Sequence, residues 1–331
     1  MKALIPVAGA GTRLRPHTFT QPKPLIPVAG KPIIAFIIDE LIQAGIREFV
    51  FVIGYLGDRI EDFMADRYPD LKVTFVHQHQ RLGLGHAVWT ARELFQPDDE
   101  VFIVLGDTIF DANIKDMLEQ PTSCIGLKKV DDPRKFGVAE LDNEGFVKSL
   151  IEKPKIPRSN LAIVGLYKIK EVKLLMDALQ YNIDNNIRTV EEFQLTDGLM
   201  RLINQGIKIR SINVGNWHDC GRKEILLETN ATLLKRSSYN TSELPFRDNT
   251  IFIHPVCIGK NCTFKNAIIG PNVTIGDNTN ITNAVVRDSI IGSDTFIEDA
   301  VLHLSVVGSD SVIKGRSQSL NIGDNTEIDF S

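Results

Sequence analysis

The sequence lacks paired cysteines, long apolar runs and an excess of positive charge. Its cysteines, Cys124, Cys220, Cys257 and Cys262, form no CxxC pair, which favours buried thiols over metal ligands. No run approaches the roughly 18 apolar residues of a membrane span, and the apolar stretch in MKALIPVAG is too short for a signal peptide. The formal net charge of −5 disfavours nucleic acid as a partner. We therefore expect a cytoplasmic protein that binds neither nucleic acid nor membrane.

The first two thirds of the 331 residues alternate apolar strands with amphipathic helices. Strands are expected at 3–7, 48–53, 72–77 and 101–105, and helices at 33–44, 58–67 and 86–94. This order predicts an α/β fold with a Rossmann-like, mostly parallel sheet that carries helices on both faces. Ligands bind at the carboxyl ends of such strands, so the residues after Ile5, Ile53, Val76 and Leu105 are candidates for a site.

The last part of the chain follows a different period. Aliphatic–glycine pairs recur every 15 to 17 residues, at Ile258-Gly259, Ile275-Gly276, Ile291-Gly292, Val307-Gly308 and Ile322-Gly323. A second apolar residue follows each aliphatic residue after six positions, at Phe264, Ile281, Ile297, Ile313 and Ile328. This repeat predicts a stacked β-solenoid and resembles the hexapeptide-repeat left-handed β-helix. We expect a catalytic domain at 1–235, a linker at 236–250 and a β-helix at 251–331.

A glycine turn follows the first predicted strand. A dinucleotide-binding loop needs a third glycine where Leu14 stands, and the GxxxxGK[ST] pattern of a P-loop is absent. The backbone N–H groups of Gly9-x-Gly11 can instead approach a nucleotide, with Arg13 and Lys23 holding its phosphates. A plain surface loop with solvated cations is the alternative.

The longer pattern resembles the signature of the sugar-1-phosphate nucleotidyltransferases. It comprises Gly9-x-Gly11-Thr12-Arg13-Leu14, then Pro22-Lys23-Pro24-Leu25 and Gly30-Lys31-Pro32. The resemblance is closest to the long form of the glucose-1-phosphate thymidylyltransferases and extends to bacterial uridylyltransferases. It implies that a nucleoside triphosphate and a sugar 1-phosphate give a nucleotide sugar and diphosphate. The nucleotide-binding residues that it implies are Ala8, Gly9, Gly11, Thr12, Arg13, Lys23, Gln78 and Gly83.

Two aspartates stand where the family binds Mg²⁺. Asp107 ends a predicted strand, and Asp219 lies in Trp217-His218-Asp219-Cys220-Gly221. Two carboxylates completed by phosphate oxygens and water suit a hard octahedral cation. A zinc site with His218 and Cys220 is a weaker interpretation, because alternate residues of an extended segment point to opposite faces. By resemblance, Asp107, Asp219, Arg13, Lys23 and Lys153 are the catalytic residues.

The resemblance also implies a site for the sugar phosphate. Its residues are Gly137, Glu152, Lys153, Ile163, Val164 and Tyr167. The arginine expected before Glu192 falls on Val190, and the nearest candidate is Arg188. Which cation takes its place is left open by the sequence.

Two other functions compete with nucleotidyl transfer. Hexapeptide solenoids often carry acetyl transfer, for which His254 and His303 are the histidines of the predicted solenoid. A non-catalytic regulatory homologue would be expected to lose Arg13 or a metal-binding aspartate, and both aspartates and Arg13 are present. We expect the β-helix to serve homo-oligomerisation. The sequence does not distinguish dTTP from UTP, which differ for this site by one methyl group.

Overall fold

The computed structural model describes residues 1–236, 238, 240, 241 and 247–315. The contacts between residues divide the chain into two compact units, with the boundary between Thr229 and Asn230. Each unit has its own sheets and its own hydrophobic core. Among the described residues, no helix is both long enough and apolar enough to cross a membrane.

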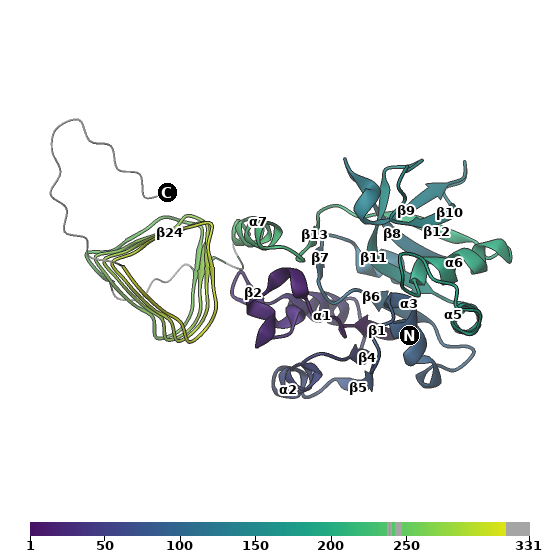
Figure 1. The fold of residues 1–331 in the computed structure, drawn as a ribbon, viewed down its shortest axis with the longest axis horizontal. Helices are drawn as coiled ribbons and strands as arrows, with labels where there is room; N and C mark the ends of the chain where they lie inside the picture. The colour runs from purple at the N-terminus through teal and green to yellow at the C-terminus, as the bar shows by residue number, and fades with distance from the viewer. Residues whose placement is uncertain (237, 239, 242–246, 316–331) are drawn as a thin grey trace. The chain divides into compact units, whose positions relative to one another are not determined.

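The first unit is built on a nine-stranded sheet (Figure 1). Its parallel part has the order β5-β4-β1-β6, with β1 (Lys2–Pro6), β4 (Glu48–Ile53), β5 (Lys72–His77) and β6 (Val101–Val104). Successive residues of β1 pack into different clusters: Leu4 joins one and Ile5 the other. The strands β1, β4 and β6 are therefore apolar on both faces, as expected for covered parallel strands. The predicted α/β fold is confirmed.

The rest of the sheet joins across a long antiparallel strand. Strand β11 (Leu161–Ile169) runs antiparallel to β6 and pairs with β8 (Ser123–Lys129) and β9 (Gly137–Leu141). Further strands are β10 (Val147–Glu152) beside β9 and β12 (Ile209–Asn213) beside β8. Outside this sheet lie the pairs β2 (Pro27–Val28) with β3 (Lys31–Pro32), and β7 (Thr108–Phe110) with β13 (Trp217–Asp219).

Helices cover both faces of the sheet. The core on one face includes residues of α3 (Leu84–Thr90), α5 (Val172–Asp184) and α6 (Leu195–Asn204). The core on the other includes residues of α1 (Ile33–Gln43), α2 (Gly57–Arg67) and α4 (Ile114–Leu118). The remaining helices are α7 (Lys223–Leu234) and the 3₁₀ turns η1 (Thr12–Leu14), η2 (His17–Phe19), η3 (Lys23–Leu25), η4 (Arg92–Leu94) and η5 (Pro133–Lys135). The helix expected at 86–94 is two elements, because α3 ends before Ala91 and η4 follows.

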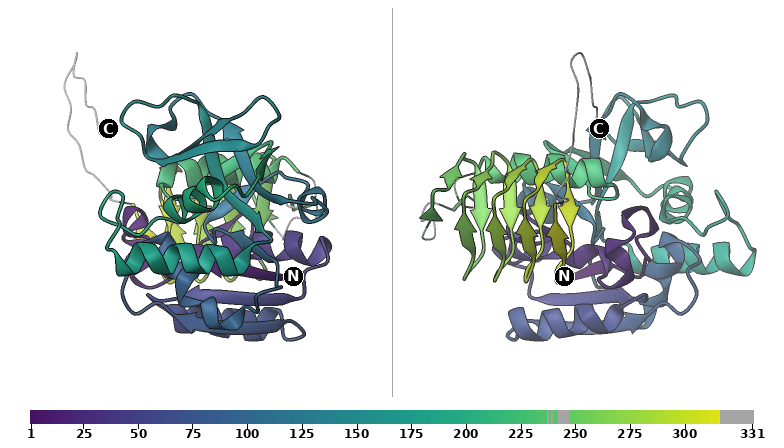
Figure 2. Two further views of the ribbon diagram at one scale, coloured as in Figure 1. Left: turned by 90° about the vertical axis from the view of Figure 1, so that its right-hand side faces the viewer. Right: turned by 60° about the vertical axis from the view of Figure 1, so that its left-hand side comes forward.

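The second unit is a three-sided parallel β-helix, whose successive coils lie side by side in Figure 2. One sheet holds β14 (Arg247–Asp248), β17 (Thr263–Lys265), β20 (Asn280–Thr282), β23 (Phe296–Glu298) and β26 (Val312–Lys314). A second holds β15 (Ile251–Phe252), β18 (Ile268–Ile269), β21 (Val285–Arg287) and β24 (Val301–His303). The third holds β16 (Val256–Ile258), β19 (Val273–Ile275), β22 (Ile290–Ile291) and β25 (Val306–Val307).

The sequence repeat matches these coils. Phe264, Ile281 and Ile297 point into the core and are at most 4% exposed. At one corner, Asn249, Asn266 and Asn283 adopt positive φ, which asparagine tolerates better than most residues. Their side-chain amides form a ladder of hydrogen bonds of 3.0 Å between coils. The repeat at Ile322-Gly323 and Ile328 lies outside the described residues.

Candidate active site

The glycine turn after β1 is held in place by its own neighbours. Gly11 has φ of +59°, and a Cβ atom there would lie 2.9 Å from Thr18 Cγ2 and 3.0 Å from Lys23 Cβ. The Thr18 hydroxyl donates to the Gly11 carbonyl at 2.9 Å. Only glycine fits this turn without strain. The turn therefore keeps η1, which begins at Thr12, close to the buried Lys23.

A cavity of about 540 Å³ opens at the carboxyl ends of the parallel strands. Its walls come from the glycine turn, from η3, from the loop after β5 and from the end of β6. All the predicted nucleotide-binding residues line it: Ala8, Gly9, Gly11, Thr12, Arg13, Lys23, Gln78 and Gly83. The cavity is where a parallel sheet places a ligand.

Lys23 brings the two predicted metal-binding aspartates together. Its Nζ atom lies 2.5 Å from Asp107 Oδ2 and 3.5 Å from Asp219 Oδ1. The pairing of β7 with β13 places Asp219 opposite Thr108, and the Cys220 N–H donates to the Asp107 carbonyl at 3.2 Å. Two carboxylates that are distant in the sequence therefore converge on one cationic group.

The charges of this cluster shift its pKa values. Burial alone would raise the pKa of Asp107, but the ammonium of Lys23 and the guanidinium of Arg13 together hold it below the usual value. For Lys23, burial alone would lower the pKa, because it disfavours the charged form. The negative charges of Asp107 and Asp219 instead raise this pKa above the usual lysine value. Asp107 is therefore ionised and Lys23 protonated at neutral pH.

Arg13 stands between this cavity and a second one of about 160 Å³. Arg13, Leu84, Leu105 and Asp107 line both. A Cβ atom on Gly221 would lie 2.9 Å from Arg13 Nη2 and 3.0 Å from Asp219 Oδ1, so guanidinium and carboxylate approach the backbone together there. The charged side chains of Arg13 and Asp107 therefore line both of these adjoining cavities.

The comparison with protein families shows to which family the chain belongs. A family described as nucleotidyl transferase matches residues 2–236. The chain belongs to this family.

Several relatives of this nucleotidyltransferase carry more specific names. It is 35% identical to the low-salt glycan biosynthesis nucleotidyltransferase Agl11 of Haloferax volcanii, over 72% of this chain and 67% of that protein. It is 32% identical to the glucose-1-phosphate thymidylyltransferase of Streptomyces antibioticus, over 88% of this chain and 87% of that protein. Among solved structures, a UDP-glucose pyrophosphorylase complexed with UDP-glucose superposes with a TM-score of 0.62 at 26% identity, covering 71% of this chain and 98% of that chain.

The second cavity gathers most of the predicted sugar-phosphate residues of the nucleotidyltransferase. Gly137, Glu152, Ile163, Val164 and Tyr167 line it. Burial raises the pKa of Glu152, although Lys153 and the Thr196 hydroxyl, which donates to its carboxylate at 3.3 Å, oppose the shift. Lys153 does not belong to this lining; its Nζ atom lies 3.5 Å from Glu152 Oε1.

The structure offers a candidate for the missing cation of the sugar-phosphate site, where Val190 takes the place of the expected arginine. Val190 is 57% exposed, and Arg188 donates to Asn186 at 2.8 Å and stacks over the ring of Phe193. Neither lines the cavity, whereas Lys135 at the end of η5 does. No side-chain hydrogen bond or ion pair joins Lys135 to a residue that the structure describes, although its charge helps to lower the pKa of the exposed Asp132. Sequence reasoning missed it, although it lies only two positions before the predicted Gly137.

The alternative zinc site finds little support. The Cys220 thiol lies 3.8 Å from the Thr229 hydroxyl, and burial raises the pKa of the thiol to about 12. A protonated thiol is a poor ligand, since metals bind the thiolate. The described part of the chain contains no cluster of three or more His, Cys, Asp or Glu side chains placed to hold a metal ion.

Proposed function

We propose that the chain joins a nucleoside triphosphate to glucose 1-phosphate, giving a nucleotide sugar and diphosphate. The observation that carries this proposal is the charged wall of Arg13, Lys23, Asp107 and Asp219 between two cavities of different size. The names of the thymidylyltransferase and the UDP-glucose pyrophosphorylase support glucose 1-phosphate as the sugar substrate. We favour dTTP over UTP because the thymidylyltransferase matches 88% of the chain. The cytoplasmic location expected from the sequence remains a prediction.

The reaction is a displacement at the α-phosphorus of the triphosphate. An oxygen of the sugar phosphate attacks this atom in line, and diphosphate leaves on the opposite side. The attacking oxygen is already anionic at neutral pH, so the protein needs no general base. Its task is to bring two polyanions together and to neutralise their charge. Arg13, which lines both cavities, is placed to contact phosphate groups of both substrates.

Asp107 and Asp219 fit a divalent cation. Both approach one cationic nitrogen, and the described residues offer no third acidic or sulfur ligand beside them. Such a pair, completed by phosphate oxygens and water, suits Mg²⁺. When bound, Mg²⁺ would neutralise charge on the phosphates. Asp107 is ready for this role at neutral pH because its pKa is held below the usual value.

A diphosphate-release assay tests the proposed function. dTTP, UTP, CTP, ATP and GTP are each combined with glucose 1-phosphate and other sugar 1-phosphates, with Mg²⁺ or with EDTA. We expect release with dTTP or UTP, loss of it in EDTA and recovery on adding Mg²⁺. Asp107→Asn is expected to lower kcat by more than ~10²-fold. Asp66→Asn, at an exposed position of α2, is the control. Turnover near that of the parent protein in Asp107→Asn contradicts the assignment.

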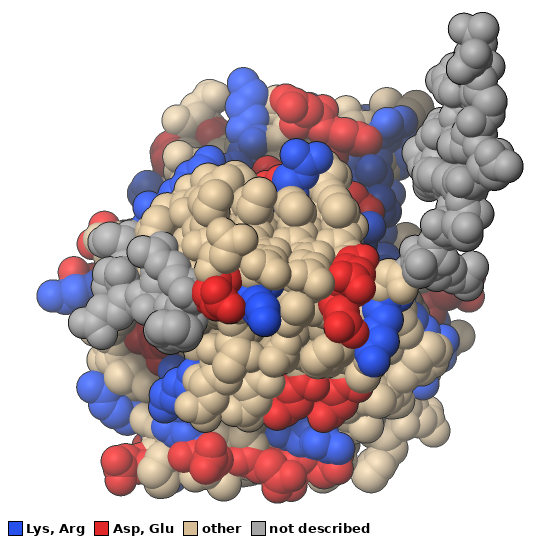
Figure 3. Space-filling view, turned by 90° about the vertical axis from the view of Figure 1, so that its left-hand side faces the viewer, with Lys and Arg blue, Asp and Glu red and all other residues tan. Residues whose placement is uncertain are grey.

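We also propose that the β-helix joins copies of the chain through the sheet of β15, β18, β21 and β24. Its outward residues Ile251, Ile268, Val285 and Val301 are stacked in register, and Ile251 and Val301 are 59% and 75% exposed. Figure 3 shows a broad area over the β-helix where charged side chains are sparse. Arg287, at the end of β21, is also exposed on this sheet, but the stacked aliphatic side chains fit a second copy of the chain better than a charged partner.

A further inference from the structure

The side-chain amide of Gln78 is fixed by two contacts on one side. Gln78 follows β5, is 6% exposed and lines the larger cavity. Its Nε2 atom lies 3.2 Å from the carbonyl oxygen of Gly83 and 2.9 Å from Nδ1 of His86. Both partners belong to the segment that begins α3.

The Gly83 carbonyl decides which way the amide faces. A carbonyl oxygen only accepts, so the nitrogen of the amide, and not its oxygen, must lie beside it. The second N–H of the same nitrogen then points at His86 Nδ1, which accepts it when the imidazole is neutral with its proton on Nε2. Burial lowers the pKa of His86, which favours this neutral form.

The ring of His86 is itself held in place. It packs against the indole of Trp89, with 5.6 Å between the ring centroids. The Thr90 hydroxyl donates to the His86 carbonyl at 2.8 Å within α3. A ring supported in this way can position the amide beside it.

The remaining polar atom of the amide is an acceptor. With both N–H groups engaged, Oε1 of Gln78 has no hydrogen-bond partner among the described residues, and the side chain lines the cavity. Uracil and thymine present a ring N–H at N3, whereas cytosine presents an acceptor at that atom. An acceptor held in one orientation therefore attracts the first two bases and repels the third.

We propose that His86 is a positioning residue, which locks the Gln78 amide so that its oxygen selects uracil or thymine over cytosine. The proposal rests on the proposed function, because it takes the larger cavity as the nucleotide site. His86 itself touches neither the reacting atoms nor, in this proposal, the base.

The test compares two replacements of His86. In His86→Leu the acceptor is lost, whereas in His86→Asn the Oδ1 atom occupies the position of Nδ1 relative to Cβ and can accept the same hydrogen bond. We expect His86→Leu to raise the KM for UTP or dTTP about tenfold, the cost of one neutral hydrogen bond, with kcat nearly unchanged. Its preference for UTP over CTP should fall by a similar factor, and His86→Asn should restore both. His79→Leu, at an exposed position of the same loop, is the control.

Equilibrium binding of UTP and CTP, without sugar phosphate, separates this proposal from the proposed function. The parent protein should bind UTP at least about tenfold more tightly than CTP, whether or not turnover is found with any sugar phosphate. Equal affinities for the two nucleotides would overturn the role of His86 even if His86→Leu does not fold. So would a His86→Asn variant as impaired as His86→Leu, because that result assigns the ring a merely structural role.

Discussion

Lys135 and Arg134 are neighbouring cations of η5 that meet different surroundings. The Arg134 guanidinium makes hydrogen bonds of 2.8 and 3.0 Å to Asp132, and this ion pair is exposed. Lys135 lines the smaller cavity together with Glu152. A charged side chain that is left for a ligand is expected to contribute more to binding than one already paired in water.

Replacing Lys135 should weaken the binding of the sugar phosphate alone. We expect Lys135→Ala to raise the KM for the sugar 1-phosphate between about tenfold and 100-fold, as for the loss of a hydrogen bond to a charged group. The KM for the nucleotide should stay within about twofold. Steady-state kinetics with each substrate varied in turn measure both values. Arg134→Ala is the matched control, and equal effects of the two variants would count against this role of Lys135.

At the scale of single elements, the glycine turn depends on one of its two glycines for its shape. Gly11 has a positive φ and close neighbours, whereas a Cβ atom on Gly9 would meet no atom within 4 Å. Gly11→Ala should therefore lower the free energy of unfolding by roughly 1–3 kcal/mol. Gly9→Ala should change it by less than about 0.5 kcal/mol. Urea unfolding followed by circular dichroism compares the two, and equal stabilities would show that the turn tolerates a side chain at Gly11.

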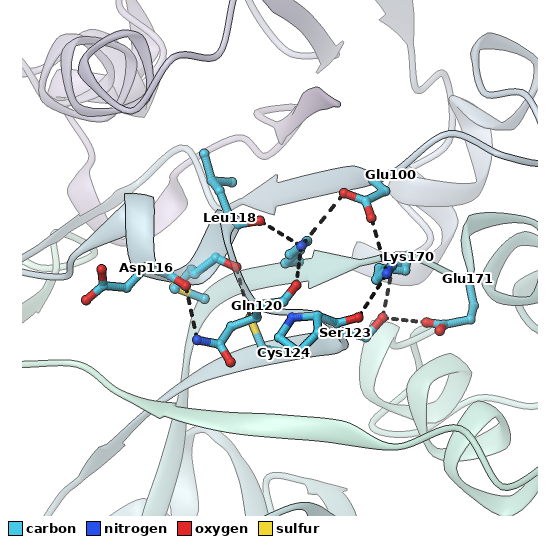
Figure 4. A network of polar contacts seen from close by, with 11 residues as sticks. Glu100, Asp116, Leu118, Gln120, Ser123, Cys124, Lys170 and Glu171 are labelled. Atoms are coloured by element: carbon cyan, nitrogen blue, oxygen red, sulfur yellow. Dashed lines mark hydrogen bonds and ion pairs between the residues drawn. The ribbon is translucent and has the colours of Figure 1, made fainter.

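A buried lysine joins β11 to the end of α4. Lys168, which is 3% exposed, donates to the carbonyls of Leu118 and Gln120 at 2.7 and 2.6 Å, and lies 3.7 Å from Glu100. Figure 4 shows this network, in which Lys170 also approaches Glu100. The last carbonyls of a helix have no partner within the helix, so the ammonium satisfies the open carbonyl of Leu118 at the end of α4 and that of Gln120 just after it.

Removing this ammonium should destabilise the first unit. We expect Lys168→Met to cost roughly 3 kcal/mol, because the carbonyls of Leu118 and Gln120 lose the donor that a buried side chain supplies, while the partly exposed Glu100 keeps only Lys170. Lys170→Met should cost less than about 1 kcal/mol, since Lys170 is 37% exposed. Chemical denaturation with unchanged m-values measures the difference. A cost for Lys168→Met no greater than for Lys170→Met would mean that the buried ammonium adds nothing to stability.

At the scale of the whole molecule, the β-helix offers sheets of different character. The sheet of β15, β18, β21 and β24 presents a stack of aliphatic side chains together with Arg287, whereas the sheet that contains β17 presents Thr263 and Lys265 as well as Val312. The predicted boundaries at 235 and 250 remain a proposal. The contacts divide the chain between Thr229 and Asn230, and β14 already begins at Arg247.

A charge on the aliphatic sheet should separate the copies. Val301→Asp and Ile251→Asp place carboxylates at exposed positions, so the fold of each copy should change little while a buried contact between copies is lost. Analytical ultracentrifugation should show a shift toward monomer in both variants. Thr263→Asp, on the polar sheet, should leave the assembly intact. A parent protein that sediments as a monomer at micromolar concentration would exclude this interface.

The sequence by itself determined what depends on neighbours along the chain. Runs such as EFVFVI became β4 because a strand covered on both faces is apolar throughout, and the period of 15 to 17 residues became the coils because each coil repeats the same corners. The glycine turn with Arg13 and Lys23 predicted a phosphate ligand only as part of the longer pattern that resembles the nucleotidyltransferase signature. Turn chemistry is local, so it can be recognised in a short stretch.

Only the tertiary structure decided which distant side chains meet. The resemblance assigned Asp107 and Asp219 to one metal site, but their approach to Lys23 depends on the pairing of β7 with β13, which no periodicity of the sequence specifies. Lys135 and His86 look like ordinary surface and helix residues until packing places one in the smaller cavity and the other against Gln78. The local pattern sets the strands and turns, but the contacts that position charges and amides form only when remote segments are packed together.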